Sequence, residues 1–135
     1  MKKISGLVAA TFTPMHADGS LNLAQVPAIV DRLVAHNIGG LYVCGSTGEG
    51  PLLTTDERKA VAEAHVKAAA GRIPVIIQAG HASNWEARDL AEHAAAIGAD
   101  GLSALPPTYI KPDSLDMLLA CLKEVAAGAP DLPFY

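Results

Sequence analysis

The chain has 135 residues, of which 50% are hydrophobic and 4% aromatic, and its formal net charge is -4 at pH 7. Intrinsic disorder is excluded, because disordered chains combine low hydrophobicity with high net charge. No stretch approaches the roughly 18 apolar residues of a membrane-spanning helix, so a membrane protein is not expected. The acidic balance gives no electrostatic reason to expect nucleic acid or an anionic membrane as a partner. The length allows one domain, residues 1–135.

The two cysteines, Cys44 and Cys121, are too few for a disulfide framework, and we interpret both as buried thiols. The basic start of the chain is not followed by an apolar segment of signal-peptide length, because Thr11 and Pro14 interrupt it. We therefore expect a reducing, cytoplasmic location.

Short apolar runs alternate with helical patterns along the chain. The runs are almost continuously apolar, which is typical of parallel strands buried on both faces. They cover residues 6–11, 40–44, 73–79, 101–105 and 132–135, and the last run reaches the end of the sequence. Successive runs begin about 30 residues apart, which is the length of a βα unit.

Helix-start signals precede the segments between the runs. Thr54 with Glu57, and Ser83 with Glu86, have the spacing of a capping box. An apolar stripe at helical spacing covers residues 115–126. Two architectures fit this βα order: an open doubly wound sheet, or a (β/α)8 barrel, which needs about 250 residues. The regular spacing alone does not decide between them.

The strongest candidate for chemistry is Gly45–Gly50, which reads Gly-Ser-Thr-Gly-Glu-Gly directly after the second run. It is neither a Walker A loop nor a dinucleotide fingerprint, because the required lysine and glycine order are absent. It offers a glycine-permitted tight backbone, free N–H groups and two hydroxyls at a strand end. Such a loop can hold a carboxylate or a phosphate. The alternative is a plain glycine-rich turn that Glu49 only braces.

Two further loops follow strands and are expected at the same edge. Residues 106–112 contain three prolines and present Tyr109 and Lys111, while residues 11–14 add two threonine hydroxyls. Hydroxyls from three loops on one face are typical of a strand-end active site. In the alternative interpretation, Tyr109 covers an interface and Lys111 is a solvated charge.

The histidines show no metal-ligand spacing with each other or with cysteines, so no metal site is expected. His65 and His93 fall in helical patterns and are expected on outer helix faces. His81 follows the third run, where it could reach the site. A Gly-x-Ser-x-Gly elbow is absent, which argues against a serine hydrolase.

The chain resembles the dihydrodipicolinate synthase / N-acetylneuraminate lyase family. Three segments carry the resemblance in order and register: residues 6–14 (Gly-Leu-Val-Ala-Ala-Thr-Phe-Thr-Pro), Gly45–Glu49, and residues 107–112 (Pro-Thr-Tyr-Ile-Lys-Pro). The Gly-Ser-Thr-Gly-Glu motif and residues 122–135 are more similar to the N-acetylneuraminate lyase branch than to the synthase branch.

The resemblance implies a (β/α)8 TIM barrel, of which this chain supplies the N-terminal half, about four and a half βα units. It implies a pyruvate-dependent class I aldolase that uses a Schiff base and no cofactor, and that works as a homo-oligomer, a tetramer in the family. Its expected reaction is cleavage of a 2-keto acid sugar to pyruvate and an aldehyde. Two alternatives are a dihydrodipicolinate synthase, which condenses pyruvate with aspartate semialdehyde, and a non-catalytic half-barrel.

The resemblance also implies roles for individual residues. Thr47 and Gly48 would bind the pyruvate carboxylate, and Ser46 would serve both that site and the proton relay. Tyr109 would reach toward the site of a neighbouring subunit. The family's Schiff-base lysine lies on the sixth strand, which this sequence does not contain, so the 135-residue chain alone is expected to be inactive. The catalytic tyrosine is expected two residues past the end, although a two-residue shift of the alignment would assign Tyr135.

Overall fold

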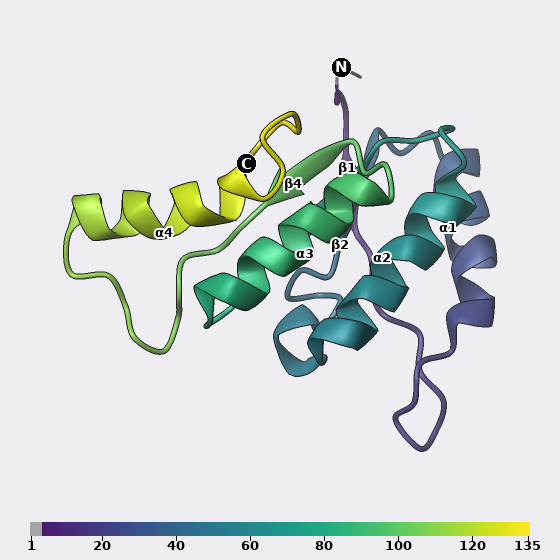
Figure 1. The fold of residues 1–135 in the computed structure, drawn as a ribbon. Helices are drawn as coiled ribbons and strands as arrows, with labels where there is room; N and C mark the ends of the chain where they lie inside the picture. The colour runs from purple at the N-terminus through teal and green to yellow at the C-terminus, as the bar shows by residue number, and fades with distance from the viewer. Residues whose placement is uncertain (1–3) are drawn as a thin grey trace.

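The computed structural model describes residues 4–135, which form successive parallel β/α units (Figure 1). The strands pair in chain order, and every pair is parallel. The strands are β1 (Val8–Ala10), β2 (Gly40–Val43), β3 (Val75–Gln78) and β4 (Gly101–Ser103). The helices are α1 (Val26–Ala35), α2 (Thr55–Ala69), α3 (Asn84–Ala96) and α4 (Leu115–Ala127), with short 3-10 helices η1 (Leu23–Gln25) and η2 (Gly50–Leu52).

The helices form one layer outside the sheet, with α1 beside α2, α2 beside α3 and α3 beside α4 (Figure 1). Strand residues Leu41, Val43, Val75 and Ile77 join the buried core on that side. A doubly wound sheet would place helices on both faces and would change its strand order. Consecutive strand order with helices on one side is half of a (β/α)8 barrel, which decides between the two architectures left open by the sequence.

The final run expected to be a strand does pair with β4. Phe134 forms a parallel bridge with Leu102, supported by hydrogen bonds from Leu102 N to Pro133 O (2.9 Å) and from Tyr135 N to Leu102 O (2.9 Å). The inner strands are shorter than the apolar runs that predicted them, because the ends of each run pass into the connecting loops.

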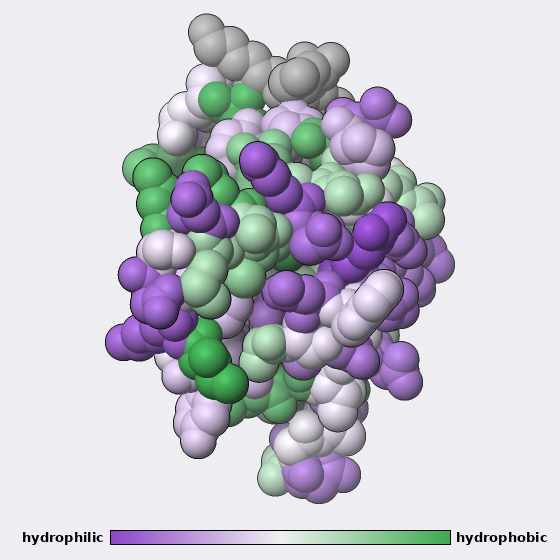
Figure 2. Space-filling model, turned by 60° about the vertical axis from the view of Figure 1, so that its left-hand side comes forward, coloured by the Kyte–Doolittle hydropathy of each residue, from purple (hydrophilic) through white to green (hydrophobic). Residues whose placement is uncertain are grey.

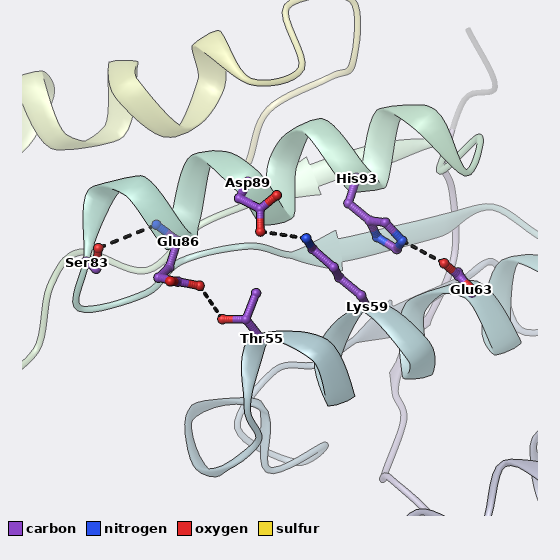
Figure 3. Close-up of polar contacts among 7 residues, drawn as sticks. All are labelled: Thr55, Lys59, Glu63, Ser83, Glu86, Asp89 and His93. Atoms are coloured by element: carbon purple, nitrogen blue, oxygen red, sulfur yellow. Dashed lines mark hydrogen bonds and ion pairs between the residues drawn. The ribbon is translucent and has the colours of Figure 1, made fainter.

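The predicted capping box at α2 is confirmed. Thr54 Oγ1 accepts from Glu57 N (3.2 Å), and the Glu57 carboxylate accepts from Thr54 N (2.8 Å). At α3 only one arm forms, since Ser83 Oγ accepts from Glu86 N (3.4 Å). The Glu86 carboxylate instead accepts from the Thr55 hydroxyl of α2 (Figure 3), so a contact between helices replaces the second arm.

A row of polar contacts continues between α2 and α3 (Figure 3). Lys59 Nζ lies 2.6 Å from Asp89 Oδ2, and His93 Nε2 lies 2.8 Å from Glu63 Oε1. Such partly exposed ion pairs contribute only about 0.2–1 kcal/mol each. Their main effect is to set how the two helices align, while the apolar core supplies the stability.

His65 is not on an outer face, contrary to the sequence expectation. It is fully buried (0% exposed), on the face of α2 that also buries Arg58, Val61 and Ala69. Its Nδ1 lies 2.9 Å from Val61 O, and Nε2 has no partner among the described residues. The expectation was wrong because a sequence pattern assigns polar side chains to solvent, whereas this polar residue occupies a core position at helical spacing.

The outer surface around α4 carries apolar side chains between charged ones. Figure 2, which brings this side forward, shows apolar groups in several separate places rather than one continuous patch. Leu115, Met117 and Leu119 are among the exposed ones. Within residues 4–135, no helix is both long enough and apolar enough to cross a membrane.

Burial lowers the pKa of His65 below its usual value, because the charged ring loses its hydration. Below pH about 6.5 the unfolded chain therefore binds a proton that the folded chain rejects, so the free energy of unfolding should fall as pH is lowered. We expect a slope of up to about 1.4 kcal/mol per pH unit from this group, measured by urea titrations between pH 7.5 and 5.

The His65→Gln variant should lose that part of the slope, while His16→Gln, at an exposed position, should keep it. Equal slopes in wild type and His65→Gln would contradict the assignment.

Candidate active site

The candidate site lies at the edge of the sheet where the parallel strands end. Residues 11–14 follow β1, Gly45–Gly50 follows β2, and residues 106–112 follow β4. Because the strands are parallel, these loops emerge at the same edge, as the sequence predicts.

The Gly45–Gly50 loop folds tightly back on the end of β2. Two non-glycine residues adopt left-handed backbone conformations, Cys44 (φ 61°) and Glu49 (φ 56°), and Gly50 N donates to Gly45 O (3.1 Å). A Cβ on Gly50 would lie only 1.9 Å from the Cys44 carbonyl oxygen. Only glycine allows this approach, and strained conformations of this kind persist where the surroundings hold them.

The loop after β1 holds the Gly45–Gly50 loop from the side. The buried Thr13 hydroxyl donates to Gly48 O (2.6 Å), and Thr11 N donates to Tyr42 O (3.1 Å). Thr13 therefore fixes the loop backbone, while Thr11 ties the loop after β1 to β2, and the sequence revealed neither contact.

The middle of the loop is open to a ligand. Ser46 and Thr47 are exposed, while Gly48 is buried. Among the described residues, the backbone N–H groups of these three have no acceptor. Adjacent unpaired N–H groups on a rigid loop form a site for an anion, and the two neighbouring hydroxyls can add to it. The geometry leaves room for the carboxylate or phosphate that the sequence predicts here, and anion binding stays a prediction.

Arg58 of α2 binds the backbone at the carboxyl end of β3, a contact that the sequence did not predict. Arg58 is 2% exposed, and its guanidinium donates through Nη2 to both oxygens of Gln78 (2.6 Å each) and through Nη1 to Gly80 O (3.1 Å). Burial lowers the pKa of Arg58 from its usual value, but a guanidinium remains charged at neutral pH. An arginine in a helical pattern is ordinarily read as a solvated charge, so no sequence signal marked it.

A small cavity of about 150 Å³ lies beside Arg58 at this edge. His81 lines it together with Gln78 and Thr108. His81 thus lies near the strand ends, as considered from the sequence, and its Nδ1 accepts from Ser83 N (3.0 Å).

Tyr109 and Lys111 are not brought against the Gly45–Gly50 loop in this structure. Tyr109 is 91% exposed, and both residues line a hollow of about 310 Å³ beside the start of α3 and the outer side of α4. Neither residue reaches the anion-binding backbone from within its own chain.

The described lysines do not supply a nucleophile inside the barrel. Lys59, Lys67 and Lys123 lie on helices, and Lys111 lies in the exposed loop after β4. Lys2 and Lys3, also candidates from the sequence, lie outside the described residues. None of these four lysines lies on a strand, so none projects from the sheet into the barrel interior.

The Tyr135 ring leans away from the strand ends. Its Cε2 lies 3.2 Å from where a Cβ of Gly101 would be, and Gly101 is the first residue of β4. The ring therefore points toward the amino end of the strands, opposite to the Gly45–Gly50 loop.

Among residues 4–135, no group of three or more His, Cys, Asp or Glu side chains is placed to hold a metal ion.

The fold and this site together define half of a (β/α)8 barrel with a tight glycine-rich loop, carrying backbone N–H groups that have no acceptor among the described residues, at the carboxyl ends of its strands. The chain belongs to the dihydrodipicolinate synthetase family, whose model matches residues 3–134.

Individual relatives agree with this assignment. The chain is 47% identical to N-acetylneuraminate lyase of Danio rerio over 137 residues, which is 100% of this chain and 45% of the relative. It is 48% identical to N-acetylneuraminate lyase A of Xenopus laevis, over 99% of this chain and 45% of that one.

Solved structures show the same similarity. The N-acetylneuraminate lyase of Proteus mirabilis matches with a TM-score of 0.96 and 40% identity over 99% of this chain and 45% of that one. A dihydrodipicolinate synthase from Aquifex aeolicus matches with a TM-score of 0.89 and 36% identity, over 96% and 43% of the two chains. The chain thus spans less than half the length of the relatives it matches.

The burial of Cys44 beneath the Gly45–Gly50 loop can be tested by the reactivity of the Cys44 thiol. Cys44 is buried, with its Sγ 3.7 Å from Arg58 O, and burial raises the pKa of the thiol to about 11. Cys121 is only half-buried, so the expectation of two buried thiols was wrong for this one. Iodoacetamide at pH 8 should alkylate Cys121 in the folded protein and Cys44 only after denaturation, as read by mass spectrometry.

The folded Cys121→Ser variant should take up no label. Labelling of folded Cys44 at a rate comparable to that of Cys121 would show that the loop does not cover it.

Proposed function

We propose that the protein is a pyruvate-dependent class I aldolase that cleaves a 2-keto acid sugar to pyruvate and an aldehyde. The relatives that support this proposal bear the name N-acetylneuraminate lyase. The observation that carries the proposal is the run of backbone N–H groups at Ser46–Gly48, which have no acceptor among the described residues and lie at the carboxyl ends of the strands. Identity of 45–48% to lyases from vertebrates supports the choice of reaction.

In this proposal, the N–H groups of Thr47 and Gly48 bind the carboxylate of the keto acid. Hydrogen bonds to a charged carboxylate are stronger than those to a neutral acceptor. The loop already holds the N–H groups in place, so binding requires no rearrangement of the backbone. The Ser46 hydroxyl, on the neighbouring exposed residue, also contacts the carboxylate and passes a proton to or from the substrate.

A lysine on the sixth strand of the barrel forms the Schiff base. Its uncharged amine attacks the keto carbon, and water leaves to give an iminium ion. The iminium accepts the electron pair when the carbon–carbon bond breaks, while the substrate hydroxyl gives up its proton and becomes the aldehyde. Protonation of the resulting enamine and hydrolysis then release pyruvate and the free lysine.

The exposed position of Tyr109 fits a role at a contact between subunits, where it would reach a neighbouring site. We accordingly include a homotetramer in the proposal. A cytoplasmic location is a separate part of the proposal and does not depend on Tyr109.

The second candidate is a dihydrodipicolinate synthase, which would use the same carboxylate loop with aspartate semialdehyde as partner. It ranks lower because the sequence relatives that match at 45–48% identity are named N-acetylneuraminate lyases. The third, a non-catalytic half-barrel, would keep the loop without the reaction.

The test is reductive trapping in an extended chain, in which residues 1–135 are continued by the C-terminal part of the barrel of the Danio rerio relative. Incubation with pyruvate and borohydride should add one pyruvate-derived group to a lysine of the extended chain and none to residues 1–135 alone. Mass spectrometry measures both. Turnover of sialic acid, compared with condensation of pyruvate and aspartate semialdehyde, separates the first candidate from the second.

A folded extended chain that takes up no label would favour the non-catalytic half-barrel. In a labelled chain, Ser46→Ala should lower kcat about 100-fold or more while the adduct still forms. The matched control Ser20→Ala, in an exposed turn, should leave kcat unchanged.

A further inference from the structure

The inner face of the sheet carries a polar contact that the mechanism above does not use. In the strand register, Tyr42 lies beside Ala10 and Ile76, while Ser103 lies beside Gln78. These positions alternate with the residues that pack under the helices, so they face the interior of the barrel.

Tyr42 and Ser103 meet across the intervening strand β3. The Ser103 hydroxyl donates to the Tyr42 hydroxyl oxygen at 2.6 Å, between residues 61 positions apart. Ser103 is 3% exposed and Tyr42 is half-buried, so solvent competes little with this hydrogen bond.

The ring of Tyr42 also lies directly against the start of the anion-binding loop. A Cβ on Gly45 would lie 2.5 Å from Cε1 and 2.8 Å from Cδ1 of Tyr42. The ring thus supports the α-carbon of the residue that precedes Ser46, and Gly45 O accepts from Gly50 N (3.1 Å) at the other end of the loop. A change in ring orientation would be transmitted to this backbone.

A phenylalanine would fill the same space as the ring of Tyr42, so packing alone does not require the hydroxyl. The hydroxyl adds the hydrogen bond to Ser103 of β4, which fixes the orientation of the ring. The ring lies against the loop that follows β2. Tyr42 O also accepts from Thr11 N (3.1 Å), which ties the same residue to the loop after β1.

We propose that Tyr42, oriented by Ser103, is a positioning residue that holds the Gly45–Gly50 loop in the conformation that binds the keto-acid carboxylate. This proposal rests on the proposed function, since it concerns the same site. Neither side chain acts on the substrate; both act through the backbone of Gly45.

The experiment uses the extended chain and its Tyr42→Phe, Ser103→Ala and doubly substituted variants. The half-saturating pyruvate concentration for borohydride trapping, and KM for the sialic acid substrate, should each rise about 2- to 10-fold, the range for one lost hydrogen bond. The amount of adduct at saturation and kcat should stay within about twofold. The double variant should be no worse than either single variant, because both remove the same contact.

Ser20→Ala is the control and should change neither quantity. Ser103→Thr restores a hydroxyl and should recover a lower half-saturating concentration than Ser103→Ala.

The proposal is overturned if both single variants keep the wild-type half-saturating concentration, if their effects add in the double variant, or if kcat falls with KM unchanged. Failure of the unsubstituted extended chain to be labelled at all would instead count against the proposed function. The two failures are therefore distinguishable.

Discussion

The site depends on one close approach, that of the Gly50 backbone to the carbonyl of Cys44. A side chain at position 50 has no room, since its Cβ would overlap the Cys44 oxygen. This contact turns the chain back at the end of β2 and leaves Cys44 and Glu49 in left-handed conformations. In this geometry the backbone N–H groups of Ser46, Thr47 and Gly48 have no acceptor among the described residues, which leaves them available for an anion.

The rest of the half-barrel supports this turn from two sides of one sheet. On the helix side, apolar residues such as Leu41 and Val75 pack under α2 and α3 and supply the stability. On the inner side, polar groups control geometry: Thr13 holds Gly48, and Ser103 holds the Tyr42 ring under Gly45. The small apolar side chains suit the packing under the helices, and the few buried hydroxyls fix the geometry of the loop.

Much of the fold could be predicted from the sequence, because local signals carry it. Continuous apolar runs indicate buried parallel strands, and the Thr54 and Glu57 spacing marks the start of α2 before any tertiary contact is known. The glycines of the Gly45–Gly50 loop mark the candidate site for the same reason, since a tight turn requires them locally.

The remaining features depend on contacts between distant segments. Tyr42 and Ser103 meet only because the strand register places both on the inner face, with β3 between them. Arg58 and His65 are buried by helix position, although their side chains indicate solvent. Glu86 was expected to complete a cap and binds Thr55 of the neighbouring helix instead. No local pattern distinguishes these arrangements from ordinary surface positions.

The most direct test of the central claim is a crystal structure of the extended chain with pyruvate reduced onto its lysine. We expect the pyruvate carboxylate at about 2.7–3.2 Å from the backbone nitrogens of Thr47 and Gly48, with Gly50 still against the Cys44 carbonyl. A carboxylate bound elsewhere in the barrel, with these two N–H groups still unpaired, would contradict it.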